Sequence, residues 1–513
     1  MHTQDWTAGY VSDLAYTFGY FPELNPLRAR FALLNKGFAA PRFETGCELG
    51  FGQGLSVNIH AAASTTEWYG TDFNPAQAAF ARELSEVSGA SARLWDEAFE
   101  DFCQRTDLPD FDYIGLHGIW SWISHANRSA IVDFLRRKLR PGGVVYVSYN
   151  TQPGWAAFAP LRHLMSEHAD VLGARGAGTA QRIEGALDFA ERLIAANPGY
   201  VRANPNVEER FKSLRPLNRN YVAHEYFNRD WNPMHFSEVA SWVAPAKLTY
   251  AGSAHFLDHV DVLNLTGDQQ ALLADIADAD FRQSVRDFMT NQQFRRDLWV
   301  RGPRQLSLLA KAEALRAQPF LLISDRADVS LKVAGALGEA TLNDGVYGPI
   351  LDQLAGYDPK TIGEVAAGVE TKGIALAQVV EAMMVLASGP DLALVQAEAV
   401  AERVRPQTDC LNAHLRDRAR GNGEVTFLAS PLTGGGIPVS RFGQLFLEAF
   451  GSGRQKPDEW AAYVWSVLSD QGQKIIKDGV TLETAEANLA ELRGQATDFS
   501  KKALPGLKAL GIA

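Results

Sequence analysis

The residues best suited to chemistry form a glycine-rich loop, Glu48–Gly54, which reads Glu-Leu-Gly-Phe-Gly-Gln-Gly and lies between a strand-like run and a helical run. Glycines let the backbone turn sharply and approach a ligand closely. Glu48 stands just before the first glycine, so its charge can pair with the cationic end of a ligand. The candidate binding residues of the loop are Glu48, Gly50, Phe51, Gly52, Gln53 and Gly54. The loop alone leaves a nicotinamide enzyme as an alternative, because dinucleotide folds use a similar one.

Carboxylates follow the next two strand-like runs, and their order favours S-adenosylmethionine over a dinucleotide. Asp72, followed by Phe73, closes the first of these runs, where a carboxylate can bind both hydroxyls of a ribose. After the next run an acid can accept a hydrogen bond from an adenine amino group and an aromatic ring can pack on the base; the residues there are Asp96, Glu97, Ala98 and Phe99. Ligands of open α/β sheets bind at the carboxyl ends of the strands. Any one of these acids alone is typical of a surface or a helix cap, whereas the ordered set predicts a cofactor site.

The segments after the fourth and fifth strand-like runs hold the candidate acceptor residues. Methyl transfer from a sulfonium is an in-line displacement, so the protein aligns the acceptor and excludes water. Trp120, Trp122 and Trp155 suit an amine that becomes a methylated ammonium, because cations are attracted to ring faces. A lysine amine must first lose a proton, and desolvation among aromatic rings lowers its pKa. The alternative for these tryptophans is packing in the core or in a lid.

The candidate catalytic residues are His117, Trp120, Tyr149 and Asn150. Tyr149 and Asn150 are placed to orient an acceptor. His117 either accepts a proton or contacts the cofactor or a backbone carbonyl, and a structural or cofactor role is favoured. Gly118 beside it is a further candidate for cofactor binding. No metal is expected, since the three cysteines lie far apart. His224-Glu225 resembles the start of a zinc-protease helix, but Asn228 stands where the second histidine would be.

Nucleic acid is disfavoured as a partner. The net charge is −11 and no long Lys/Arg block occurs, whereas a duplex-binding groove needs a concentrated basic face. The segment after the fourth strand, Leu116–Trp122, lacks the Asp/Asn-Pro-Pro-Tyr/Phe motif of amino-methylating nucleic-acid enzymes, and no Pro-Cys pair occurs for cytosine-5 chemistry.

The elements that must position these residues alternate strand-like and helical runs between about 42 and 150, which predicts βαβ units and a parallel sheet. A helix is predicted over Asn127–Leu139, ending at Arg140-Pro141-Gly142-Gly143. Residues 160–240 look helical and are predicted to be inserted before the last two strands. The predicted strands are Arg42–Leu49, Trp68–Phe73, Ala92–Trp95, Phe111–Leu116, Gly143–Tyr149, Ala246–Tyr250 and Phe294–Val300.

The predicted architecture is α/β, a doubly wound Rossmann-like core with a helical insert and a mostly α-helical C-terminal domain. Residues 1–40, rich in tyrosine and phenylalanine, are interpreted as a helical lead-in. The expected boundaries are 1–160 for the cofactor-binding core, 161–244 for the insert, 245–304 for the strands that complete the sheet, 305–400 for a winged-helix-like unit and 401–513 for a final domain. The winged-helix-like unit carries no Lys or Arg between Lys372 and Arg403, so a protein-facing or structural role is favoured over DNA binding.

A cytoplasmic location is expected. No apolar run is long enough for a membrane span, and Met1–Asp5 has neither the basic nor the apolar region of a secretory signal. Cys47, Cys103 and Cys410 form no disulfide framework, which fits a reducing compartment.

The motifs together resemble a known family. Glu48–Gly54, His117–Trp122, Ser148–Trp155 and Ala223–Phe227 are similar to bacterial class I methyltransferases that carry a methyltransferase regulatory domain, among which are the rickettsial protein lysine methyltransferases. The resemblance is strongest over 1–305. It implies S-adenosylmethionine as methyl donor, S-adenosylhomocysteine as product and a protein lysine as acceptor. It also implies cofactor roles for Glu48, Gly50, Gly52, Gly54, Asp72, Asp96 and His117.

Three functions remain open at this point. The first is a protein-lysine N-methyltransferase whose insert and C-terminal domain bind the polypeptide. The second is a small-molecule or glycan O/N-methyltransferase in which these domains form a closed lid or the interface of a homodimer. The third is a regulator that binds S-adenosylmethionine without catalysis.

Overall fold

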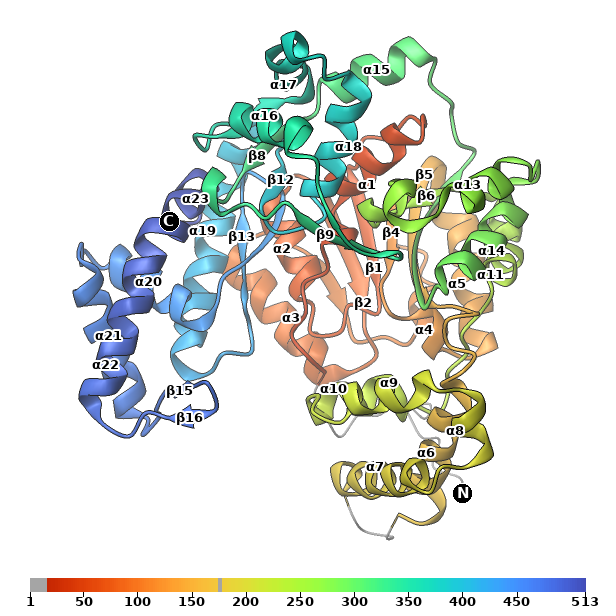
Figure 1. Cartoon of the computed structure of the whole chain (residues 1–513), viewed down its shortest axis with the longest axis horizontal. Coiled ribbons are helices and arrows are strands. Elements are labelled where there is room, and N and C mark those ends of the chain that lie inside the picture. The colour runs from red at the N-terminus through yellow and green to blue at the C-terminus, as the bar shows by residue number, and fades with distance from the viewer. Residues whose placement is uncertain (1–15, 174–177) are drawn as a thin grey trace.

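Residues 16–173 and 178–513 are described by the computed structural model, which places a seven-stranded sheet at the centre of the molecule (Figure 1). The strand order is β3-β2-β1-β4-β5-β7-β6, and β7 alone runs antiparallel to its neighbours β5 and β6. The strands are buried and rich in apolar side chains, as both faces of the sheet are covered. Their bounds are β1 Thr45–Leu49, β2 Glu67–Thr71, β3 Arg93–Trp95, β4 Phe111–Leu116, β5 Leu139–Asn150, β6 Leu248–Ser253 and β7 Phe294–Arg301.

The predicted α/β core is confirmed, including the two late strands that return to the sheet after the insert. The main difference lies at the start of β5, which begins at Leu139 instead of Gly143. Leu139 pairs with Phe111 and Val144 pairs with Tyr113, so the residues between them form a bulge at Pro141-Gly142. Gly142 has φ +82°, a conformation that glycine adopts readily, so the breaker residues bend the strand without ending it.

Helices cover both faces of the sheet. On one face α1, α2 and α3 share a core with β2, β4 and β5; on the other face α4, α5 and α11 pack on β1, β2, β4 and β5 and on Trp299 of β7. Every residue of α2 is buried. The bounds are α1 Pro26–Asn35, α2 Leu55–Ala63, α3 Pro75–Ser88, α4 Phe99–Phe102, α5 His125–Lys138 and α11 Phe236–Val243.

The segment before α1 is not the continuous helix that the sequence suggests. Its described part, from Tyr16 to Phe21, has no helical structure, and helical turns start only at Pro22. Gly19 and Pro22 interrupt any helix there. Tyr20 is buried, and its hydroxyl lies 3.1 Å from Nε2 of His60 in α2. The remainder of the expected lead-in, with Tyr10 and the Met1–Asp5 segment, lies outside the described residues.

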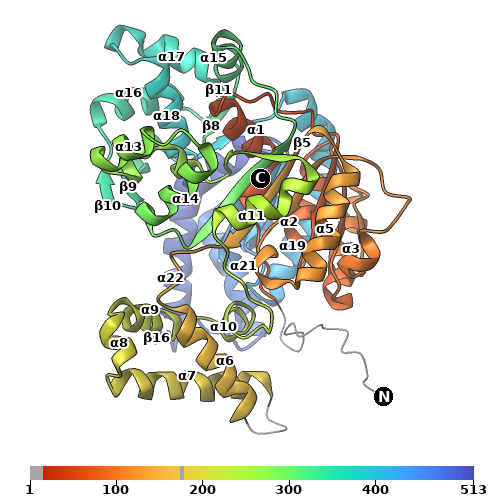
Figure 2. The same cartoon turned by 90° about the vertical axis from the view of Figure 1, so that its right-hand side faces the viewer.

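The insert is an all-helical unit with its own core, and it stands below the carboxyl ends of the strands in Figures 1 and 2. Trp155, Phe158, Phe211 and Tyr226 lie in this core. The last helix of the expected insert, α11, packs on the sheet instead, because Phe236 stacks on Trp299 at a centroid distance of 5.5 Å. The helices of the unit are α6 Ala159–Val171, α7 Thr179–Ala195, α8 Gly199–Ala203, α9 Asn206–Leu214 and α10 Arg219–Tyr226.

Three short helices connect β6 to β7 at the far edge of the sheet, and a helical region with small sheets follows β7. The three-stranded antiparallel sheet β11-β8-β12 carries α16, α17 and α18, and Thr361 caps α17 in a capping box with Glu364. The bounds are α12 Asp261–Asn264, α13 Gly267–Ala274, α14 Ala279–Thr290, α15 Leu308–Arg316, β8 Pro319–Leu322, β9 Lys332–Gly335, β10 Gly338–Thr341, α16 Asp344–Leu354, β11 Lys360–Thr361, α17 Ile362–Val369, α18 Leu376–Leu386 and β12 Leu392–Leu394.

The final part of the chain packs against the core rather than standing apart from it. Leu411 and Leu415 of α19 share a hydrophobic cluster with Ile59 of α2 and Leu84 of α3. The bounds are α19 Glu398–Gly421, β13 Phe427–Ser430, β14 Gly435–Pro438, α20 Arg441–Gly451, α21 Pro457–Asp470, β15 Ile476–Lys477, β16 Val480–Thr481, α22 Ala485–Asp498 and α23 Leu504–Ala509. None of the helices in residues 16–173 and 178–513 is both long and apolar enough to cross a membrane.

Candidate functional site

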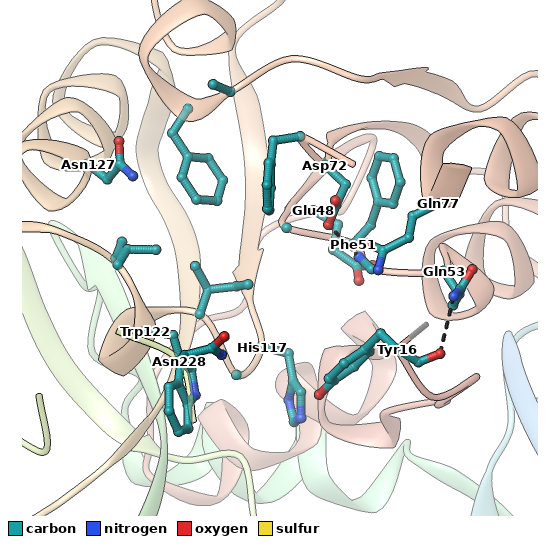
Figure 3. Close-up of a pocket in the computed structure, with 18 of the residues that line it drawn as sticks. Tyr16, Glu48, Phe51, Gln53, Asp72, Gln77, His117, Trp122, Asn127 and Asn228 are labelled. Atoms are coloured by element: carbon teal, nitrogen blue, oxygen red, sulfur yellow. Dashed lines mark hydrogen bonds between the residues drawn. The ribbon is translucent and has the colours of Figure 1, made fainter. Parts of the chain in front are cut away.

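A cavity lies at the carboxyl ends of β1, β2 and β4, where the segments that follow these strands meet (Figure 3). Twelve of the expected cofactor residues line it: Glu48, Gly50, Phe51, Gly52, Gln53, Asp72, Phe73, Glu97, Ala98, Phe99, His117 and Gly118. The N-terminal segment closes one side with Tyr16 and Phe21, and the Asn228–Asp230 segment of the insert closes another. Residues from six separate stretches of the described chain therefore line the cavity.

The glycine loop is held in shape by Asp72. Gly52 donates its backbone N–H to Oδ2 of Asp72 at 2.9 Å, and Asn74 donates to Oδ1 at 3.0 Å. Gly50 has φ +72°, and a side-chain Cβ there would come within 2.4 Å of Ile119. Any other residue would strain the backbone at this φ, and its side chain would occupy the space beside Ile119. This position therefore requires glycine.

Glu48 and Asp72 form a pair of buried acids at the base of the cavity, and Figure 3 shows them side by side. Oε2 of Glu48 is buried and has no hydrogen-bond partner among the described residues. Burial, and secondarily the charge of Asp72, raises the pKa of Glu48 to about 8; burial raises the pKa of Asp72 to about 7. An unpartnered buried carboxylate fits a ligand that brings a cation, which the amino group of S-adenosylmethionine is.

The raised pKa of Glu48 predicts how stability changes with pH in the ligand-free protein. A carboxyl whose pKa is higher in the folded state stabilises the fold below its unfolded pKa of about 4.5 and loses that contribution as the pH rises through about 8. We therefore expect the melting temperature of Glu48→Gln, relative to wild type, to rise by a few degrees between pH 5 and pH 8. Thermal melts across that range measure it, with Glu86→Gln on the exposed face of α3 as control. Parallel curves for Glu48→Gln and wild type would contradict the assignment.

The end of the cavity beside β3 differs from expectation in one residue. Glu97, Ala98 and Phe99 line the cavity, but Asp96 does not. Asp96 is half-exposed and accepts a hydrogen bond from Arg82 of α3 at 2.6 Å, so its carboxylate is turned to the surface. Glu97 is held by Arg105, also at 2.6 Å. The expected contact of Asp96 with adenine is thus not supported by its position, and Glu97 is the acid that faces the cavity.

Gly54 likewise lies outside the lining. It is the N-cap of α2 with φ +71°, and it packs against Ala81 of α3. Its role in the loop is to let α2 approach α3 closely, which is the packing function that the third glycine of such loops has in dinucleotide folds.

His117 is a neutral, partly buried ring in the wall of the cavity. Its Nδ1 lies 2.8 Å from the hydroxyl of Tyr146, and its ring stacks on Phe21 with centroids 3.8 Å apart. Burial lowers its pKa to about 4, against the opposing charge of Glu23. A ring with this pKa is a weak proton acceptor at neutral pH, so the geometry favours a cofactor or structural role.

The other three candidate catalytic residues do not line this cavity. Trp120 is fully buried in the core cluster below it, edge-to-face with Trp242. The Tyr149 hydroxyl donates to Asp297 at 2.7 Å, on the opposite side of the sheet from Asn150, because successive side chains of a strand alternate. Asn150 is buried, its Nδ2 has no partner within the described chain, and it lines a second cavity.

The second cavity adjoins the first and extends between the sheet edge and helices α9 and α10 of the insert. Both cavities share Tyr16, Phe21, His117, Gly118 and Trp122. These shared residues form a seam between the two cavities, where a molecule in the second cavity can reach a cofactor in the first. The wall on the insert side carries Trp155, Phe158, Arg210, Tyr221, Glu225 and Tyr226.

Sequence reasoning missed the lining residues of the N-terminal segment and of the insert. Tyr16 and Phe21 could have been found from the density of aromatic residues near the start of the chain, and Glu225 from its place in the polar-aromatic run 224–231. Neither signal says which cavity the residues face. Among residues 16–173 and 178–513, no group of three or more His, Cys, Asp or Glu is placed to hold a metal ion.

The sheet order, the antiparallel β7 and the glycine loop with its acids define a class I methyltransferase, whose cofactor is S-adenosylmethionine. A family model described as "Methyltransferase domain" matches residues 47–147, and one described as "Predicted methyltransferase regulatory domain" matches residues 218–301. The second range starts in α10 and ends with β7, so it spans the end of the insert and the last two strands.

The chain belongs to the family of class I methyltransferases that carry this regulatory domain. It is 40% identical to the uncharacterized protein sll1526 of Synechocystis over 517 aligned positions, which cover 99% of this chain and all of that protein. It is 30% identical to the protein RP028 of Rickettsia prowazekii over 26% of this chain and 54% of that protein. In fold it is similar to PKMT2 from Rickettsia typhi, solved in complex with AdoHcy, with a TM-score of 0.68 and 17% identity over 94% of this chain and 98% of that one.

Proposed function

We propose that the protein is a protein-lysine N-methyltransferase. The observation that carries the proposal is the second cavity, which opens onto the cofactor cavity at Tyr16, His117 and Trp122 and is walled by aromatic rings. Aromatic faces accommodate a methylated ammonium and lower the pKa of an amine by excluding water. The resemblance of the motifs to the rickettsial protein lysine methyltransferases and the fold similarity to PKMT2 from Rickettsia typhi support the same acceptor class.

S-adenosylmethionine, when bound, supplies an electrophilic methyl group. In this proposal Glu48 pairs with its amino group, Asp72 binds its ribose hydroxyls, and Glu97 with Phe99 holds the adenine. Trp122 and Asn150 orient the acceptor at the seam, where burial excludes water. The insert and the C-terminal region bind the polypeptide that carries the lysine, and the boundaries 1–160, 161–244, 245–304, 305–400 and 401–513 remain the proposed units. Three free cysteines agree with the cytoplasmic location that is part of the proposal.

The test follows the methyl group. The protein is incubated with methyl-labelled S-adenosylmethionine and a lysate of its host, proteins are separated from small molecules, and labelled proteins are digested and analysed by mass spectrometry. We expect label in protein, on lysine side chains. Label confined to the small-molecule fraction would overturn the proposal in favour of a small-molecule or glycan acceptor. The variant Asp72→Ala, which should not bind the donor, is the control for label transferred by enzymes of the lysate.

A further inference from the structure

Glu225 of α10 is a carboxylate in the wall of the second cavity. It is partly buried, and it forms no hydrogen bond or ion pair with a residue in the described ranges 16–173 and 178–513. Its nearest cation in electrostatic terms is Arg162 of α6. Arg162 is held elsewhere: it donates to the backbone oxygen of Asn228 at 2.6 Å and lies 4.7 Å from the centroid of the Trp231 ring. Arg162 and Glu225 therefore balance each other's charge at a distance, but no hydrogen bond or ion pair joins them in the described residues, which leaves the carboxylate oxygens open to a ligand.

The surroundings of Glu225 are those of a cation site. Burial, and secondarily the charge of Glu225, raises the pKa of Tyr221 to about 12, and the same two causes raise the pKa of Tyr16. Tyr16 also lines the cofactor cavity, so the carboxylate lies beside the seam where the two cavities meet.

The same wall already holds one cation. The guanidinium carbon of Arg210 lies 3.8 Å from the ring centroid of Trp155 and 4.7 Å from that of Phe158. Arg210 has no carboxylate partner within the described residues. The Arg210 cation is thus held by ring faces, and Glu225 lies in the same wall as a carboxylate that could bind a second cation.

We propose that Glu225 binds the ammonium group of the acceptor and accepts its proton. The proton passes from the acceptor nitrogen to a carboxylate oxygen of Glu225; the ammonium becomes a neutral amine with a free lone pair, and the carboxylate becomes a carboxylic acid. This proposal rests on the proposed function only in naming a protein lysine as the source of the amine. The site itself would accept any primary amine on an aliphatic chain.

The proton transfer needs a carboxyl that ionises near neutral pH. Burial raises the pKa of Glu225 to about 7, and Arg162 opposes the rise. The titratable groups that face it are Arg162 from α6, Tyr16 from the N-terminal segment, and Tyr221 and Tyr226 from its own helix. Because the free carboxyl is neutral below pH 7, amine binding should strengthen as the pH rises through about 7.

Binding of a probe amine tests the proposal without turnover. Nα-acetyl-lysine amide is titrated into the full-length protein saturated with AdoHcy, and Nα-acetyl-norleucine amide, which lacks the amine, is the matched ligand. We expect Glu225→Gln to weaken binding of the lysine probe by about tenfold or more, the effect of losing a charged hydrogen-bond partner. Binding of the norleucine probe and of AdoHcy should not change. The control Glu209→Gln removes an exposed acid from the rim of the same cavity and should leave both probes unaffected.

The pH dependence is the second readout. In wild type the affinity for the lysine probe should rise between pH 6 and pH 8, and in Glu225→Gln it should be flat. Equal affinities of wild type and Glu225→Gln for the lysine probe would overturn the proposal, even if labelled methyl enters protein lysines. The two proposals can also fail separately. If labelled methyl enters only small molecules while binding of the lysine probe still depends on Glu225, the protein-lysine function is wrong and the amine site is supported.

Discussion

Replacing Asp72 by alanine should lower the affinity for AdoHcy by more than about a hundredfold. The carboxylate fixes the glycine loop through Gly52, and in the proposed function it also binds the ribose hydroxyls. A hydrogen bond to a charged group contributes roughly 1.5–3 kcal/mol, and two such contacts correspond to at least about 3 kcal/mol of binding free energy. Isothermal titration calorimetry with AdoHcy measures the change.

The matched control is Asp96→Asn. Both acids follow neighbouring strands, but Asp96 lies at the surface beside Arg82, so its replacement should leave AdoHcy binding unchanged. A 2′-deoxyribose analogue of AdoHcy separates the ribose contact from the support of the loop. It should bind wild type more weakly than AdoHcy, whereas Asp72→Ala should not distinguish the two ligands. Equal losses in Asp72→Ala and Asp96→Asn would show that the ribose assignment is wrong.

Gly54→Ala should destabilise the fold by about 2–5 kcal/mol. Gly54 has φ +71°, where a side chain costs roughly 1–2 kcal/mol. A Cβ at this position would also come within 2.4 Å of the Cβ of Ala81 and 3.2 Å of its Cα, and overpacking of this kind costs about 1–3 kcal/mol. Chemical denaturation of the ligand-free protein measures the loss.

Gly89 at the end of α3 separates the two contributions. It has φ +66°, and a Cβ there would meet nothing within 4 Å, so Gly89→Ala should show the backbone cost alone, about 1 kcal/mol. Combining Gly54→Ala with Ala81→Gly should recover part of the loss, because the two methyl carbons no longer collide. If Gly54→Ala and Gly89→Ala cost the same, close packing of α2 on α3 is not what requires the glycine.

The parts of this molecule that could be predicted from its sequence are those determined by local pattern. Phe111–Leu116 was predicted to the residue as a strand, since it is apolar and bounded by polar and turn residues. The glycine loop was predicted as part of a cofactor site because its spacing is itself the requirement for a close backbone approach. The late strands were predicted from short β-branched and aromatic runs.

The parts that could not be predicted depend on contacts between distant segments. Asp96 and Glu97 are neighbours in one turn, and only the position of Arg82 decides which of them turns away from the cavity. Alternation along the strand places Tyr149 and Asn150 on opposite sides of the sheet, but which of the two meets a cavity depends on the distant segments that pack there, such as Asp297 on β7 beside Tyr149. The N-terminal segment and Glu225 reach the cavity through folding of the whole chain, which no local periodicity encodes.

The burial of all nine residues of α2 has a consequence for how the protein unfolds. This helix, which begins at the cofactor loop, is covered on its outer side by Leu411 and Leu415 of α19, and Gln396 donates to the backbone oxygen of Ala63 at its end. Removing the C-terminal region would expose the apolar side of α2 to water. The core and the C-terminal region should therefore unfold together in one cooperative transition. A fragment that ends after β7 should aggregate rather than act as a smaller enzyme.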